Sequence, residues 1–347
     1  MKRHLLFLAA LLIVNLAASA QKKFSVYAVG FYNQENLFDT CHDEGKKDYE
    51  YLPNKGWNGM KYTNKLRNMS KALADMGTDV LPNVGCAFIG LAEVENHKVL
   101  DALVDQAPLK ARNMKYVHIE GPDRRGIDCA LLYNPSLFSV KNVKLLPYVQ
   151  ELAKDSAFFT RGFLTVRGEM AGDDVAVIVC HWPSRFSGPF YRESAARQVK
   201  VIKDSLLNVN QEMKIFVMGD MNDDPVNKSM HVYLQAKPEI SQVGAGDMYN
   251  PWYNVLAKEG KGTLFYSGNW NLFDQIVITP NLLNKDAKNK DYSSLKYWKS
   301  HIFRRDYLIQ QEGQYKGAPL RTTAGGRWLN GYSDHLPVVM YLVKEKR

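Results

Sequence analysis

The chain has 347 residues, of which 46% are hydrophobic and 23% are charged, and its formal net charge is +9. This composition excludes a disordered or low-complexity protein, because there are enough apolar residues to bury a large core. The positive excess favours a polyanionic partner only weakly, since many basic proteins bind no nucleic acid. No linker or internal repeat divides the chain, so we expect a single domain over residues 21–347.

The first twenty residues have the pattern of an export signal. Lys2 and Arg3 precede a mostly apolar run, Leu5–Leu16, and Ala18-Ser19-Ala20 supplies small residues for cleavage. The run is shorter than the roughly 20 residues of a membrane-spanning helix. The residue after the cleavage position is Gln21 and not Cys, which disfavours a lipoprotein. We therefore expect a periplasmic or extracellular monomer without a transmembrane segment.

The four cysteines, Cys41, Cys86, Cys129 and Cys180, do not have the spacing of a metal site. Cys129 and Cys180 lie inside apolar strand patterns, and we expect them to pack as small hydrophobic residues. Cys41 and Cys86 are a candidate pair, because an exported protein can form disulfides without requiring them.

Short apolar runs alternate along the chain with amphipathic stretches. These runs predict strands at residues 25–32, 86–91, 127–133, 163–170, 175–180, 215–218, 275–279 and 336–343. Apolar residues at helical spacing predict helices at residues 58–76 and 192–207. Strand-rich halves separated by helices indicate two sheets packed face to face with helices outside, an α/β sandwich.

Polar side chains gather where the predicted strands start or end. Asp220 and Asn222 follow the apolar run 215–218, and Ser333-Asp334-His335 precedes the run 336–343. Each such motif alone is explained by a turn, a helix cap or a core hydrogen bond. Burying so many carboxylates is costly unless they share a cation or a histidine, so together they favour a site for a hard divalent cation and a phosphate. The nine residues are Asn33, Glu35, Glu93, His181, Asp220, Asn222, Asp274, Asp334 and His335.

Seven motifs, in their order along the chain, resemble those of the endonuclease/exonuclease/phosphatase superfamily. They lie at residues 33–38 (NQENLF), 91–96 (LAEVEN), 125–133 (RGIDCALLY), 181–184 (HWPS), 219–223 (GDMND), 273–276 (FDQI) and 333–335 (SDH). The resemblance covers essentially the whole chain after residue 20. It implies a four-layer α/β sandwich, with two packed, mainly antiparallel β-sheets flanked by helices, as in deoxyribonucleases and abasic-site endonucleases.

The resemblance also implies a role for each site residue. Mg²⁺, with Mn²⁺ or Ca²⁺ as alternatives, is expected to be bound by Asn33, Glu35, Glu93 and Asp334. The residues expected to be catalytic are His181, Asp220, Asn222, Asp274 and His335. Either Asp220 or His335, oriented by Asp274, is expected to take the proton of the attacking water. Phosphate contacts are expected from Arg161, Asn222 and His181, and Asp128 is the expected partner of His181.

The leading hypothesis is an exported, metal-dependent phosphodiesterase, specifically a nuclease that cleaves nucleic acid by in-line attack of water. A sphingomyelinase-like phospholipid hydrolase, a small-phosphoester phosphatase and an inactive binding member of the fold are the alternatives. Arg185, Arg192 and Arg197 follow His181 and could contact a phosphate backbone, although a solvated basic helix face explains them more simply. Two aromatic-rich segments, 39–57 and 292–328, are expected to be loops that shape substrate access or simple surface excursions.

Overall fold

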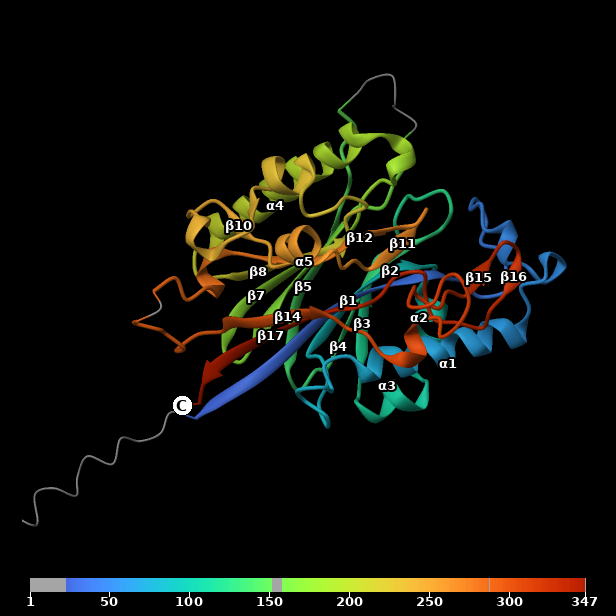
Figure 1. The fold of residues 1–347 in the computed structure, drawn as a ribbon, viewed down its shortest axis with the longest axis horizontal. Helices are drawn as coiled ribbons and strands as arrows, with labels where there is room; N and C mark the ends of the chain where they lie inside the picture. The colour runs from blue at the N-terminus through green and yellow to red at the C-terminus, as the bar shows by residue number, and fades with distance from the viewer. Residues whose placement is uncertain (1–22, 152–157, 287, 347) are drawn as a thin grey trace, which may run out of the picture.

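The structure is a computed structural model that describes residues 23–151, 158–286 and 288–346; the predicted export signal lies outside them. Two large β-sheets form its centre (Figure 1). The first has six strands, in the order β14 (Lys296–Ile302), β17 (Val338–Glu345), β1 (Phe24–Leu37), β2 (Phe88–Val94), β4 (Asp128–Tyr133) and β3 (Lys115–His118). The second has seven strands, in the order β5 (Phe138–Leu146), β6 (Phe163–Met170), β7 (Asp173–His181), β8 (Lys214–Asp220), β13 (Asp274–Ile278), β10 (Met248–Tyr249) and β9 (Ala236–Lys237).

Two small hairpins and the helices complete the fold. The hairpins are β11 (Leu264–Tyr266) with β12 (Asn269–Asn271), and β15 (Thr323–Ala324) with β16 (Arg327–Trp328). The α-helices are α1 (Gly59–Asp75), α2 (His97–Val104), α3 (Ala107–Ala111), α4 (Pro189–Val209) and α5 (Trp252–Glu259). Short 3₁₀ turns occur at Tyr49–Tyr51, Pro53–Lys55, Arg185–Ser187, Ile240–Gln242, Pro280–Leu282 and Asp306–Leu308, and a π-turn at Ser229–Tyr233.

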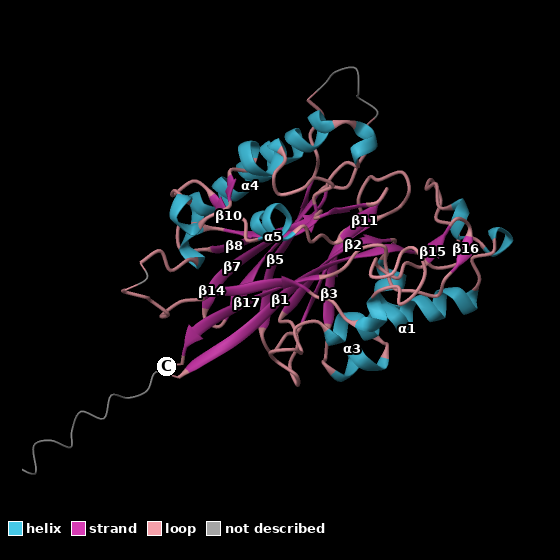
Figure 2. Ribbon diagram, in the orientation of Figure 1, coloured by secondary structure: helices cyan, strands magenta, loops and turns pink. Residues whose placement is uncertain are grey.

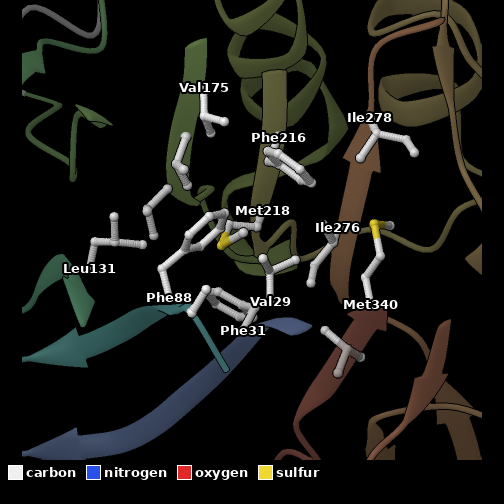
Figure 3. Packing of buried hydrophobic residues seen from close by; sticks show 14 of the residues in the cluster. Val29, Phe31, Phe88, Leu131, Val175, Phe216, Met218, Ile276, Ile278 and Met340 are labelled. Atoms are coloured by element: carbon white, nitrogen blue, oxygen red, sulfur yellow. The ribbon is translucent and has the colours of Figure 1, made fainter. Parts of the chain in front are cut away.

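The layers follow from the alternation of side chains along the strands. Phe31 of β1, Phe88 of β2 and Met218 of β8 belong to one buried cluster between the two sheets (Figure 3). The opposite face of the first sheet packs against α1 and α2, and that of the second against α4. Figure 2 shows helices on both outer sides of the strands. The predicted four-layer sandwich is confirmed, and antiparallel strand pairs predominate in both sheets.

The predicted elements are confirmed, with shifted boundaries. The helix predicted at 192–207 begins earlier, at Pro189, because a proline is well suited to the first turn of a helix. The strand predicted to end near residue 91 continues to Val94 across an irregularity between Ala92 and Val94. The strands β3, β5 and β14 were not predicted, and β14 lies in the segment 292–328, which was expected to be a loop or a surface excursion. The two-residue strands β9, β10, β15 and β16 were not predicted either, because two residues carry no detectable periodicity.

All four cysteines are free thiols. Cys41 is exposed, whereas Cys86 is buried near the carbonyl oxygen of Met76, so the candidate Cys41–Cys86 pairing is wrong. Cys129 and Cys180 are buried in the apolar clusters on the two sheets, as predicted. Within the part of the chain that the structure describes, none of the helices has the length and apolar character needed to cross a membrane.

Candidate active site

Strand pairing brings the predicted residues of distant segments to one edge of the sheets. The parallel pair β7–β8 sets His181 opposite Asp220, and the antiparallel pair β8–β13 sets Asp274 on the other side of Asp220. From the first sheet, the Asn33 amide donates to Asp220 Oδ2 at 3.0 Å. We call the group that surrounds this point the strand-end floor: Asn33, Glu93, His181, Asp220, Asp274 and His335.

The backbone is strained where it delivers this group. Glu35, Asn36, Glu93 and Asn222 have φ values of 45°, 55°, 61° and 49°, in the left-handed region that disfavours side chains other than glycine and asparagine. Such a conformation costs about 1–3 kcal/mol per residue and persists only where the surroundings impose it. At Glu93 the surroundings include the N–H of Asn36, which donates to Glu93 Oε2 at 2.9 Å. Strain at these motif residues is typical of a functional site.

His335 and Asp274 form a buried pair. His335 Nδ1 donates to Asp274 Oδ2 at 2.7 Å, and both residues are almost fully buried. Burial alone would lower the pKa of His335, but the charges of Asp274 and Asp220 outweigh it and hold the pKa well above the usual value. His335 is therefore held as an imidazolium with a fixed orientation.

Asp220 lies between the two histidines. Its Oδ2 is 3.7 Å from His181 Nε2 and 3.8 Å from His335 Nε2, too long for hydrogen bonds. Burial raises the pKa of Asp220, although the positive charge of His335 opposes the shift. A buried carboxylate of raised pKa is a better proton acceptor than an exposed one.

His181 differs from His335 in having no carboxylate partner on its second nitrogen. Its Nδ1 has no hydrogen-bond partner among the described residues. Burial, together with the charges of Arg161 and Arg125, lowers its pKa well below the usual value, so the ring is neutral. The expected pairing with Asp128 is wrong: Asp128 instead accepts from His118 Nε2 at 3.0 Å and from the Gly121 N–H. Asp128, at the start of β4, is therefore bound to the neighbouring strand β3, which carries His118. The motif spacing did not reveal that β3 pairs with β4 at the edge of this sheet.

The four residues expected to bind metal are not gathered around one point: Glu35 and Asp334 both contact Arg321, whereas Glu93 lies near His181. In the described residues, no group of three or more His, Cys, Asp or Glu side chains is arranged to hold a metal ion. Glu35 Oε2 accepts from the Thr322 N–H, and Glu93 Oε1 is 3.7 Å from His181 Nε2. Burial and the charge of Asp334 raise the pKa of Glu35, which shows that negative charge accumulates here.

Two cations that sequence analysis missed lie among these carboxylates. Arg321 Nη2 donates to Asp334 Oδ2 at 2.8 Å, and its Nε is 3.6 Å from Glu35 Oε1. Lys65 is fully buried in α1 and donates to Thr322 Oγ1 and to the Tyr332 carbonyl, each at 2.6 Å. Burial lowers the pKa of Lys65 to about 8. Lys65 has a sequence signal, since it is a charged residue beside Leu66 on the apolar stripe of its helix.

The residues expected to contact phosphate are held by the backbone of the motif that contains His181. Arg161 and the Asn222 amide both donate to the Trp182 carbonyl oxygen, at 3.0 Å and 2.9 Å. Arg161 also donates to Asp123 at 2.9 Å, while its Nε has no hydrogen-bond partner among the described residues. The structure thus brings Arg161 and Asn222 beside His181, and their phosphate contacts stay a prediction.

The three arginines after His181 do not form the basic surface that would contact a phosphate backbone. Arg192 is 4% exposed and forms an ion pair with Asp223 at 2.8 Å. Arg185 pairs with Asp224 and lies over the Phe273 ring, and Arg197 pairs with Glu151. The solvated helix face is therefore also the wrong explanation for Arg192, which is a buried structural residue.

Comparisons with known proteins agree with the geometry. The family model described as "Endonuclease/Exonuclease/phosphatase family" matches residues 28–344. No curated protein matches the chain. Among solved structures, an endonuclease/exonuclease/phosphatase family protein from Bacteroides thetaiotaomicron is 14% identical, with a TM-score of 0.55 over 93% of this chain and 97% of its own.

Two further solved structures carry functional descriptions. A mannosyl-6-phosphatase from B. thetaiotaomicron is 14% identical, with a TM-score of 0.53 over 91% of this chain and 99% of its own. TDP2 of D. rerio, in complex with a single-strand DNA product, is 11% identical, with a TM-score of 0.53 over 92% of this chain and 99% of its own. At such identities the likeness shows a shared fold.

Proposed function

Because the chain belongs to the endonuclease/exonuclease/phosphatase family, whose members are metal-dependent phosphoesterases, we propose that it hydrolyses phosphoesters by attack of water at the strand-end floor. The observation that carries the proposal is the convergence on Asp220 Oδ2 of two histidine Nε2 atoms, at 3.7 Å and 3.8 Å, and the Asn33 amide. We assign the reaction to residues 21–347 as one catalytic unit. The export-type pattern of residues 1–20 supports action outside the cytoplasm.

The donor set suits a hard divalent cation. Its oxygens come from carboxylates and one amide, the ligands that Mg²⁺, Mn²⁺ and Ca²⁺ prefer. The raised pKa of Glu35 is a further sign of fit, since a cation would relieve the repulsion from Asp334. The residues that would hold the ion are Asn33, Glu35, Glu93 and Asp334. When bound, such an ion polarises a phosphoryl oxygen as a Lewis acid.

The protein groups divide the proton transfers. Asp220, a buried carboxylate, accepts the proton of the attacking water. His335, kept protonated by Asp274, offers positive charge to the phosphoryl group as negative charge develops there. His181 is neutral and donates a hydrogen bond to the leaving oxygen as its bond to phosphorus breaks, and that oxygen then takes up a proton from solvent. This assignment favours Asp220 over the His335–Asp274 pair as the base.

The two candidate substrate classes are a small phosphoester and nucleic acid. The nuclease hypothesis loses the support of the arginine cluster and keeps only that of the positive net charge, because Arg192 is buried and Arg185 and Arg197 are paired with acids. A cavity of about 630 Å³ beside Asp334 favours a compact ester instead. We therefore propose a small phosphoester as the first candidate. Nucleic acid is the second, because TDP2 of D. rerio has the same fold and is in complex with a DNA product.

The test is an activity panel with the purified protein. Hexose 6-phosphate, a nucleoside 5′-monophosphate, single-stranded DNA and RNA, plasmid DNA and sphingomyelin are each assayed with Mg²⁺, Mn²⁺, Ca²⁺ or a chelator. We expect Mg²⁺- or Mn²⁺-dependent release of phosphate from at least one small ester, and no turnover with the chelator. Hydrolysis that persists undiminished in the chelator would contradict the metal assignment, and cleavage of polynucleotides alone would favour the second candidate.

A further inference from the structure

A cavity of about 630 Å³ opens beside Asp334. Its walls come from the β11–β12 hairpin, the β15–β16 hairpin and the chain between them, at residues 310–321. Figure 1 shows β15 and β16 at the right of the view, far from the C-terminus at the lower left. The volume is within the range of small-molecule sites. None of the residues expected from the sequence to be catalytic lines it, so it is separate from the strand-end floor and yet adjacent to it.

The cavity is fixed to the active site by two contacts. Leu264 of β11 forms an isolated β-bridge with His335 of the floor. This bridge fixes the position of the hairpin that carries Phe265 and Tyr266 relative to the floor. Asp334 and Arg321 both line the cavity, and Arg321 also forms ion pairs with Asp334 and with Glu35 of the expected metal set. A phosphate bound at the floor would therefore hold its ester group at the entrance to the cavity.

The lining has the chemistry of a site for a hydroxylated ring. Tyr266 is 69% exposed and Tyr315 51% exposed, and neither ring stacks on another ring among the described residues. Exposed aromatic rings on a cavity wall offer flat faces to a ring-shaped ligand. The hydroxyls of Ser267 and Thr323 and the amide of Gln310 add polar groups to the same wall.

Arg321 joins the cavity to the phosphate position. The Arg321 side chain is 38% exposed; its Nη2 donates to Asp334, and its Nε, 3.6 Å from Glu35 Oε1, has no hydrogen-bond partner among the described residues. A guanidinium presents several donors in one plane and suits a phosphate better than two spaced carboxylates. Arg321 thus has donor capacity that its protein contacts do not use.

We propose that this cavity binds the sugar ring of the phosphoester substrate and that Arg321 donates to its phosphate. The ring belongs either to a free sugar phosphate or to a terminal nucleotide. This inference rests on the proposed function, since it names the substrate class of the same site. It makes Tyr266 and Tyr315 specificity residues, and it gives Arg321 a substrate contact that the family motifs do not include.

The first experiment separates ring recognition from catalysis. Values of kcat/KM are measured for hexose 6-phosphate, a nucleoside 5′-monophosphate and glycerol 2-phosphate, which has no ring. The double variant Tyr266→Ala/Tyr315→Ala is expected to lose about tenfold in kcat/KM for a ring-bearing ester. The loss for glycerol 2-phosphate should be much smaller, because this ester has no ring to contact either tyrosine. Trp298→Ala, which removes a half-exposed aromatic residue from β14, is the matched control.

A loss on both ring-bearing esters, with little loss on glycerol 2-phosphate, supports the cavity assignment for either source of the ring. A loss confined to hexose 6-phosphate assigns the ring to a free sugar phosphate, and one confined to the nucleotide assigns it to a terminal nucleotide. An equal loss on all three esters, or on none, overturns the cavity assignment while leaving phosphoester hydrolysis intact. If the parent protein hydrolyses none of them, the proposed function fails. Calorimetric binding of the two ring-bearing esters to the parent and the double variant then tests the cavity separately.

The second experiment tests Arg321 by two effects of opposite sign. In Arg321→Met, the inhibition constant for inorganic phosphate should rise about tenfold or more, because a charged donor to phosphate is lost. The Mg²⁺ concentration for half-maximal activity should stay the same or fall, because the substitution removes the guanidinium that competes with Mg²⁺ for Glu35 and Asp334. Arg321→Lys should retain an intermediate phosphate affinity. Arg304→Met, in the same segment but outside the cavity, is the control.

The opposite pattern would contradict the role of Arg321. Suppose that Arg321→Met raises the Mg²⁺ concentration for half-maximal activity and leaves the inhibition constant for phosphate unchanged. Arg321 then only positions the acidic side chains. If the Met variant does not fold, the Lys variant keeps the positive charge and tests phosphate affinity alone, where an unchanged inhibition constant also overturns the proposal.

Discussion

The strand-end floor and the segment 303–334, which we call the rim, are built in different ways. Floor residues come from paired strands, and the pairing places Asp220 opposite both His181 and Asp274. The rim has few backbone ladders of its own and is held by side chains from elsewhere: Lys65 and Glu35 both hydrogen-bond to Thr322. The two regions meet where Ser333 Oγ of the rim donates to the Asn33 carbonyl oxygen at 2.8 Å, but strand pairing holds most of the floor and side chains hold the rim. This arrangement suits a fixed reaction with an adjustable specificity.

The floor should carry the larger catalytic effects. We predict that Glu93→Gln lowers kcat/KM by about 10³-fold, because a carboxylate of the expected metal set loses its charge. Steady-state kinetics at several Mg²⁺ concentrations measure the loss. Glu95→Gln is the matched control, since burial already raises the pKa of Glu95 to about 8 and the change mimics its protonated form. If Glu93→Gln keeps the activity of the parent protein, the assignment of Glu93 to the metal set is wrong.

His335 and Asp274 should act as one unit of the floor. His335→Ala is predicted to lower kcat about 10²–10³-fold, the range of a lost proton-transfer or charge-stabilising group. Asp274→Asn should lower it by less, because the imidazole remains. The double variant should be little slower than His335→Ala alone, since Asp274 acts through its 2.7 Å contact with His335. Losses that multiply in the double variant would show that the two side chains act independently.

Sequence analysis predicted the floor because the floor depends on patterns that sequence records. Apolar runs mark buried strands, and a polar residue at the end of a run is visible without a structure, as at Asp220 and His181. The parallel and antiparallel pairing could not be derived from these runs. The resemblance to a family supplied only the mainly antiparallel character of the two sheets, which the strand pairs confirm, whereas the strand order was not predicted.

The failures concern side chains whose partners are set by tertiary contacts. Asp128 was assigned to His181 from motif order, whereas the edge pairing of β3 with β4 gives it His118. Arg192 has the spacing of an exposed helix position, but its helix packs against the loop that carries Asp223. Arg321 lies in the long segment 292–328, for which the sequence predicted only a loop or a surface excursion. Nothing in the sequence shows that the fold returns this segment to Glu35.

A rim anchor should have a smaller and local effect. Lys65→Met removes two hydrogen bonds to the rim, so we predict that it lowers the local opening free energy there by about 1–3 kcal/mol. Hydrogen exchange should speed up at the amides of Thr322 and Tyr332 and not in β8. Arg67→Met, at an exposed position of the same helix, is the control. Faster exchange throughout β8 would show that floor and rim unfold together.

The smallest effect concerns the pH dependence of folding stability. Burial lowers the pKa of His181 in the folded state, so the unfolded chain binds the proton more readily. The contribution of His181 to stability is therefore present above its unfolded pKa of about 6.5 and is lost as the pH falls toward the folded value. The loss is at most about 1.4 kcal/mol per pH unit for one group. His335 has the opposite sign: its raised pKa stabilises the fold below about pH 6.5, and this contribution is lost as the pH rises through the folded value.

Urea unfolding at pH 5, 6, 7 and 8 in the presence of a chelator tests the sign for His181. His181→Asn should gain stability relative to the parent protein as the pH is lowered from 7 to 5, because the variant no longer has a buried ring that resists protonation. His97→Asn, which changes an exposed histidine at the start of α2, controls for the substitution itself. A stability difference between His181→Asn and the parent that is constant across the four pH values would mean that His181 is not held neutral, and the leaving-group role that depends on a neutral ring would then be wrong.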